Sequence, residues 1–98
     1  MRAYELMYII KPDKDEEEIT AQIDRIGEAI ESSGGKVEGV IQSEPWGRRR
    51  LAYEIENYED GYYVLCHFSS DKEGLDELER ILKLSENILR YLLTRRVE

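Results

Sequence analysis

Two stretches of this chain repeat apolar residues at the spacing of an α-helix, and each lies between stretches that alternate like β-strands. The first stripe consists of Ile19, Ile23, Ile26 and Ile30, and the second of Leu75, Leu78, Ile81 and Leu82. An amphipathic helix must bury its apolar stripe, and the alternating segments supply a sheet for it to cover. This order of patterns restricts the chain to a layer of helices on a layer of strands.

The alternating segments have the two-residue period of strands and cover 2–10, 36–43, 49–56, 62–68 and 87–95. Pro45-Trp46-Gly47 separates the second from the third. Because proline cannot donate to a strand ladder, we predict that 36–56 is one long, bent strand at a sheet edge or bulge. Residues 57–61 then form a hairpin connection.

Helix boundaries are marked by capping residues. Asp15, with Glu18 three residues later, predicts a helix that begins near Glu16, and Ser33-Gly34-Gly35 predicts its end. Ser70 followed by Glu73 predicts the start of the second helix. The element order is therefore βαββαβ.

Right-handed crossovers in this order place both helices on one face of a four-stranded antiparallel sheet. The predicted class is α+β with a ferredoxin-like arrangement. Ninety-eight residues are the size of one domain, so we expect a single unit over residues 1–98.

Several classes of protein do not fit the composition. No apolar run approaches the roughly 20 residues of a membrane helix, and the first residues resemble no secretory signal, so we expect a cytoplasmic protein without a membrane partner. Cys66 is the only cysteine and His67 the only histidine, which excludes an internal disulfide and a four-ligand zinc site. We predict no metal and no cofactor.

Catalysis is also disfavoured. Cys66 and His67 are neighbours on one strand and point to opposite faces, so they cannot form a nucleophile and base pair. Acylphosphatase-like enzymes share this fold, but they need a phosphate-cradling loop after the first strand, and residues 11–15 are acidic and lack glycine. We therefore expect neither an enzyme nor a small-molecule substrate.

Charge is distributed unevenly along the chain. The net charge is −8, which by itself opposes nucleic-acid binding. The two helical regions, 13–31 and 71–83, carry all of this excess, while the remaining segments are balanced and contain clustered arginines. The folded molecule should be electrically two-sided.

The sheet face away from the helices resembles an RNA-recognition motif only in part. Tyr62 and Phe68 should lie under the helices, leaving Tyr63 as the one aromatic residue of its strand on the open face. That face also carries apolar residues such as Met7, Ile9 and Leu92, and we expect something to cover it.

The segment from Trp46 to Tyr53 combines two aromatic residues, a glycine and three consecutive arginines. It suits phosphate contact or docking to a polar partner. The alternative is that the arginines protect an edge strand from unwanted pairing.

Three runs together resemble bacterial ribosomal protein number six of the small subunit. They are Met1 to Glu5, Trp46 to Ile55 and Gly61-Tyr62-Tyr63, and the resemblance covers the whole chain. It implies a structural protein that binds the central domain of small-subunit ribosomal RNA together with small-subunit ribosomal protein number eighteen, as a heterodimer. No enzyme or cofactor is implied.

The resemblance and the arginine clusters give two expected sites. We expect RNA contacts from Arg2, Tyr4, Arg90, Arg95 and Arg96, gathered at one basic end where the first and last strands are neighbours. We expect the protein partner at the opposite edge, on Trp46, Arg48, Arg49, Arg50 and Tyr53. A ferredoxin-like regulatory or metabolite-binding module remains the alternative function.

Overall fold

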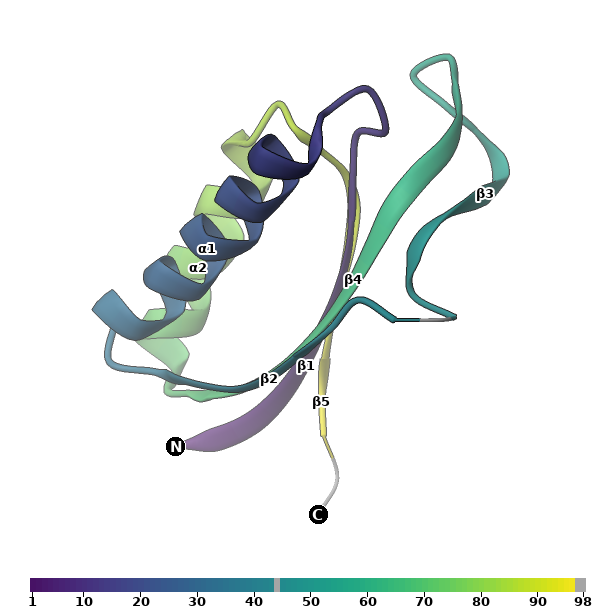
Figure 1. The fold of residues 1–98 in the computed structure, drawn as a ribbon. Helices are drawn as coiled ribbons and strands as arrows, with labels where there is room; N and C mark the ends of the chain where they lie inside the picture. Colours follow the sequence, from purple (N-terminus) through teal and green to yellow (C-terminus); the bar gives the residue numbers. More distant parts are fainter. Residues whose placement is uncertain (44, 97–98) are drawn as a thin grey trace.

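The protein is described by a computed structural model that covers residues 1–43 and 45–96. A curved antiparallel sheet has both helices on one side (Figure 1). The elements are β1 (Arg2–Ile10), α1 (Glu16–Ser32), β2 (Lys36–Ile41), β3 (Gly47–Ile55), β4 (Tyr58–Ser70), α2 (Lys72–Leu84) and β5 (Ile88–Arg95). Neither helix is long and apolar enough to cross a membrane. This arrangement confirms the ferredoxin-like α+β prediction.

The sheet is built around β4, which pairs with β1 on one side. On its other side β4 pairs with β3 near its start and with β2 near its end. The predicted long second strand is thus two strands placed along the same edge, separated at the Pro45 region, and the described residues form a five-stranded sheet instead of the predicted four-stranded one. β5 pairs with β1 and forms the opposite edge of the sheet.

The first helix begins as predicted, because the Asp15 carboxylate accepts the backbone N–H of Glu18 at 2.8 Å. The prediction for the second helix was one residue early. Asp71, rather than Ser70, is the N-cap, and its carboxylate accepts the N–H of Gly74 at 2.9 Å. Ser70 is buried at the end of β4, where its hydroxyl donates to the Asp71 carbonyl.

The hairpin between β3 and β4 is tighter than the predicted connection over residues 57–61. Only Glu56 and Asn57 form the turn, and both have positive φ values, 50° and 70°. Two consecutive left-handed residues match the twist of the flanking strands. β4 therefore begins at Tyr58, and Gly61 is a strand residue.

The main core lies between the helices and one face of the sheet. Its largest fully buried side chains are Leu6, Tyr8, Ile10, Val64, Phe68 and Leu78. Tyr62 packs against the same cluster, so the predicted division of β4 into two faces is confirmed. Cys66 also lies in this core, and burial raises the pKa of its thiol to about 11.

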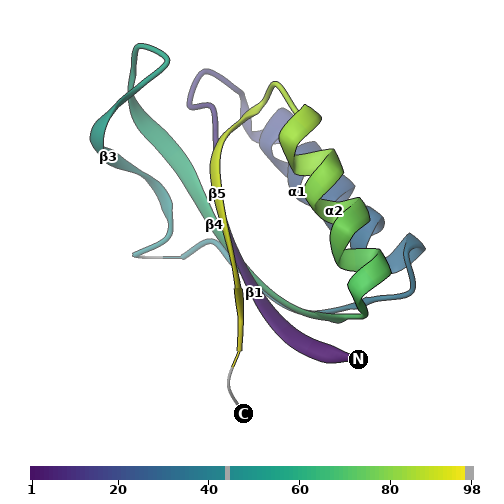
Figure 2. The ribbon, with the colours of Figure 1, turned by 180° about the vertical axis from the view of Figure 1, so that it is seen from behind.

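A second, smaller core lies on the face away from the helices. It consists of Ile9, Leu51, Ile55 and Leu89, with Met7, Tyr58 and Tyr63 packed against it. β3 curls away from the plane of the other strands on this side (Figure 2). The chain itself thus covers part of the face that the sequence predicted to be apolar.

Candidate functional site

Arginines from both ends of the chain lie together at one end of the sheet. Tyr4 pairs in register with Arg95, and the Arg96 N–H donates to the Ala3 carbonyl at 2.9 Å. Arg2 pairs with Ser70 on the other side of β1. We call Arg2, Tyr4, Arg95 and Arg96 the basic end; the predicted proximity of Arg2, Arg95 and Arg96 is confirmed for their backbone positions.

Arg90 does not belong to the basic end, and this part of the prediction was wrong. It pairs with Ile9, five residues along β1 from Tyr4, which corresponds to about 17 Å of strand. The cause is the antiparallel register, because it places the start of β5 beside the end of β1. Arg90 belongs to the same strand as Arg95, but it lies near the opposite end of that strand.

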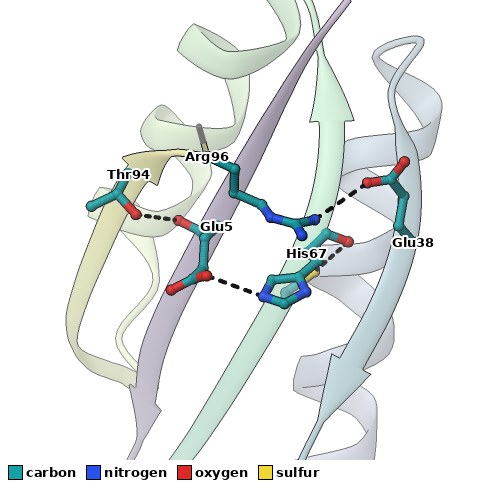
Figure 3. A network of polar contacts seen from close by, with 6 residues as sticks. Glu5, Glu38, His67, Thr94 and Arg96 are labelled. Atoms are coloured by element: carbon teal, nitrogen blue, oxygen red, sulfur yellow. Dashed lines mark hydrogen bonds and ion pairs between the residues drawn. The ribbon is translucent and has the colours of Figure 1, made fainter. Parts of the chain in front are cut away.

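Arg95 and Arg96 have different surroundings. Arg95 shares the helix side of the sheet with Tyr4, whose ring stacks on Phe68 with centroids 5.7 Å apart. On the open face the Arg96 side chain extends across β1 and β4 toward β2, where it forms an ion pair with Glu38 at 3.8 Å (Figure 3). Beside it, His67 Nε2 lies 3.1 Å from a Glu5 carboxylate oxygen.

All three consecutive arginines of β3 are exposed, and Arg48 and Arg49 have separate side-chain contacts. Arg48 donates to the Pro12 carbonyl at 2.8 Å, in the loop between β1 and α1. Arg49 lies over the Tyr63 ring, 5.2 Å from its centroid, and donates to the Pro45 carbonyl. Two of the three therefore fix the position of β3, a structural role that the sequence did not predict.

Two further contacts join the β3–β4 hairpin to the β1–α1 loop. The Tyr58 hydroxyl donates to Asp13 at 2.9 Å, and Lys11 lies 3.9 Å from Glu56. The hydrogen bond to Asp13 is the main reason that the pKa of Tyr58 is raised. We call these two contacts and the Arg48–Pro12 bond the hairpin clasp. The clasp links the curled β3–β4 hairpin to the β1–α1 loop.

An apolar groove of about 250 Å³ opens between β3 and the sheet. Its lining includes Met7, Leu51, Tyr53, Tyr63 and Arg90. Tyr53 is 65% exposed at its edge, and Leu92, on the same face, is 57% exposed. Tyr53 belongs to the predicted docking segment, but its proximity to Met7 and Arg90 arises only in the folded chain.

Trp46 lies at the sheet edge just before β3 and is half-buried. Its N–H donates to the Ser43 carbonyl at 2.8 Å. The residues that line the groove do not include Trp46. The predicted docking segment therefore contributes to the groove mainly through the second half of β3.

The described residues contain no group of three or more His, Cys, Asp or Glu side chains placed to hold a metal ion. Over the same residues, every buried side-chain nitrogen and oxygen has a hydrogen-bond partner. The described surface has a cationic end and an apolar groove with an exposed tyrosine. These features suit contacts with macromolecules.

Comparisons with known proteins agree with this arrangement. The family model described as ribosomal protein S6 matches residues 3–95. The small ribosomal subunit protein bS6 of Natranaerobius thermophilus is 46% identical, covering 97% of this chain and 96% of the relative. The corresponding protein of Moorella thermoacetica is 43% identical, with 97% and 94% coverage.

A solved structure gives the same result in three dimensions. The crystal structure of 30S ribosomal protein S6 from Thermotoga maritima superposes with a TM-score of 0.89 at 35% identity. The match covers 97% of this chain and 87% of that chain. The chain therefore belongs to the ribosomal protein S6 family.

Proposed function

We propose that this chain binds the central domain of small-subunit ribosomal RNA as one half of a heterodimer with small-subunit ribosomal protein number eighteen. The observation that carries the proposal is the gathering of Arg2, Arg95 and Arg96 at one end of a chain whose net charge is −8. The basic end would contact RNA phosphates. The groove beside β3 would dock the partner protein.

The family supplies the setting of this proposal. A ribosomal protein S6 is a structural component of the small ribosomal subunit and not an enzyme. It is cytoplasmic and ribosome-associated. The regulatory, metabolite-binding alternative is therefore set aside.

The partner surface is supported by the chemistry of the open face. The groove is apolar and has Tyr53 at its edge, and exposed aromatic residues are typical anchors of protein interfaces. Arg90 lines the groove, so we assign it to this surface rather than to RNA. Trp46 and Arg50 do not line the groove, and we assign them to the partner surface only as part of the same edge segment as Tyr53.

The RNA surface is supported by electrostatics. Phosphate binding releases counterions from the RNA. It requires cationic side chains that can give up any ion pairs with carboxylates of the protein itself. Arg2 and Arg95 form no ion pair within the described residues, whereas Arg96 would have to exchange Glu38 for a phosphate. Because the whole chain repels RNA, the basic end alone should bind weakly, and a basic partner should strengthen binding.

The first test is filter binding of a central-domain RNA fragment, with and without the partner protein. We expect weak binding by the chain alone and tight, salt-dependent binding by the pair. Tight binding of short single-stranded RNA by the isolated chain would favour an RNA-recognition mode instead. Failure of the protein to co-purify with small ribosomal subunits would contradict the proposal altogether.

A second test separates the two surfaces. Arg2→Ala should lower the salt slope of RNA binding by about one unit for each lost phosphate contact and leave the heterodimer intact. Tyr53→Ala, Trp46→Ala and Arg90→Ala should weaken the heterodimer, measured without RNA. If Arg90→Ala loses RNA affinity but still forms the heterodimer, Arg90 belongs to the RNA surface.

A further inference from the structure

We infer that Lys72, the first residue of α2, is a phosphate contact of the basic end. This inference rests on the proposed RNA-binding function, and it concerns a lysine within the acidic segment 71–83. Lys72 is seventy positions from Arg2 in the chain. Only the fold brings the two residues together.

The two cations line one cavity. It has a volume of about 210 Å³ and is lined by Met1, Arg2, Tyr4, Ser70, Asp71 and Lys72. Because Arg2 pairs with Ser70 at the end of β4, and α2 begins two residues later, Lys72 must lie beside the start of β1. Figure 2 shows the first turn of α2 next to the N-terminal end of β1.

The chemistry of the cavity favours a phosphodiester. A guanidinium and an ammonium can both donate to the non-bridging oxygens of one phosphate, and the Tyr4 hydroxyl is a third donor. Arg95 lies on the same side of the sheet, in register with Tyr4. Within the described residues, neither Arg2 nor Lys72 forms an ion pair, so phosphate binding would not require either side chain to leave a carboxylate.

Asp71 is the one carboxylate that lines the cavity, and it is already engaged. It accepts the Gly74 N–H at 2.9 Å and caps the positive end of the α2 dipole, which offsets part of its charge. The capped helix terminus thus contributes little to anion binding. Anion binding at this cavity would therefore depend on the cationic side chains.

The experiment compares Lys72→Ala with Lys83→Ala in the heterodimer bound to a central-domain RNA fragment. Both lysines are exposed residues of α2, and each substitution removes one positive charge, but Lys83 lies in the last turn. We expect Lys72→Ala to reduce the salt slope of RNA binding by about 0.7 to 0.9 unit. Lys83→Ala should leave the slope unchanged, and Lys72→Arg should retain it.

Three outcomes would overturn the inference. Equal slopes for Lys72→Ala and Lys83→Ala would mean that the cavity contacts no phosphate, while RNA binding by the wild-type pair would leave the proposed function standing. Weaker heterodimer formation by Lys72→Ala without RNA would mean that the cavity receives carboxylates of the partner protein. Absence of RNA binding by the wild-type pair would refute the proposed function and this inference together.

Discussion

Gly61 shows how one residue without a side chain sets the position of β3. It is buried within β4, and an added Cβ atom would collide with Ile9 Cγ2 and lie 3.2 Å from Leu51 Cδ2. Ile9 and Leu51 are both members of the second core. The missing side chain therefore lets β3 pack closely on the open face of the sheet.

We predict that Gly61→Ala lowers the free energy of unfolding by about 1 to 3 kcal/mol, the usual cost of overpacking a core. Gly39→Ala is the matched control, because Gly39 is also a strand residue and a Cβ there meets nothing within 4 Å. Urea denaturation of both variants measures the difference. Equal stabilities would show that Ile9 and Leu51 move aside freely.

Because of two buried ionisable residues, the free energy of unfolding depends on pH in the alkaline range. Burial raises the pKa of Cys66 from 9.0 to about 11, and burial also raises the pKa of Tyr8 above its ordinary value of 10.0. Above pH 9 the unfolded chain releases these protons while the folded chain keeps them. The unfolded state then binds fewer protons, so stability falls as pH rises.

We predict that the free energy of unfolding falls between pH 9 and pH 11, by of the order of 1 kcal/mol per pH unit for Cys66. Tyr8 should add to this loss above pH 10. Urea denaturation at several pH values measures the slope. Cys66→Ala should be less stable at neutral pH but should lose the part of the slope that begins near pH 9; an unchanged slope would contradict the assignment.

At the level of elements, the β3–β4 hairpin is the part that depends most on a few contacts. The ladder between β3 and β4 is interrupted between Arg50 and Ile55, so this stretch of β3 has fewer backbone bonds. Its position is held by the hairpin clasp and by Leu51 and Ile55 in the second core. Since β3 forms one wall of the groove, the clasp also determines the shape of the proposed partner surface.

We predict that Tyr58→Phe, which removes the hydrogen bond to Asp13, speeds amide hydrogen exchange in residues 51–55 and weakens partner binding. Tyr53→Phe is the control for exchange, because the Tyr53 side chain is largely exposed. Exchange measured by NMR should separate the two variants. If both variants exchange at the wild-type rate, the clasp does not hold the hairpin.

At the level of the whole molecule, the acidic helices and the basic end divide the charge between two regions. Exposed carboxylates such as Glu17, Asp24 and Glu28 follow the outer side of α1, in the layer that covers one face of the sheet (Figure 1). Their field repels RNA at long range without touching it. We expect this repulsion to make the proposed RNA binding depend on a basic partner.

Replacing Glu17, Asp24 and Glu28 with their amides should therefore raise the association rate of the isolated chain with RNA. The gain should appear at low salt and disappear at roughly 0.5 M salt, where charges are screened within a few ångströms. Stopped-flow association at both salt concentrations measures it. A gain that persists at high salt would mean that these side chains contact RNA directly.

The sequence by itself determined the order of helices and strands, apart from the division of residues 36–56 into β2 and β3, and it determined the start of α1 and the two faces of β4. These follow from local physics, because apolar spacing, capping residues and alternation act over a few neighbouring residues. Two predictions from the same local signals were wrong: the N-cap of α2 is Asp71 rather than Ser70, and the β3–β4 turn is Glu56 and Asn57 rather than residues 57–61. Neighbouring polar residues compete for such positions, and only packing decides between them.

The tertiary structure alone decided which distant residues share a surface. Because β1 and β5 are antiparallel, Arg90 lies away from the basic end and lines the groove with Met7 and Tyr53. It also placed Lys72 beside Arg2. Strand register depends on how both faces of the sheet pack, with the main core on one side and the second core on the other. No single segment of the chain contains the information that sets this packing.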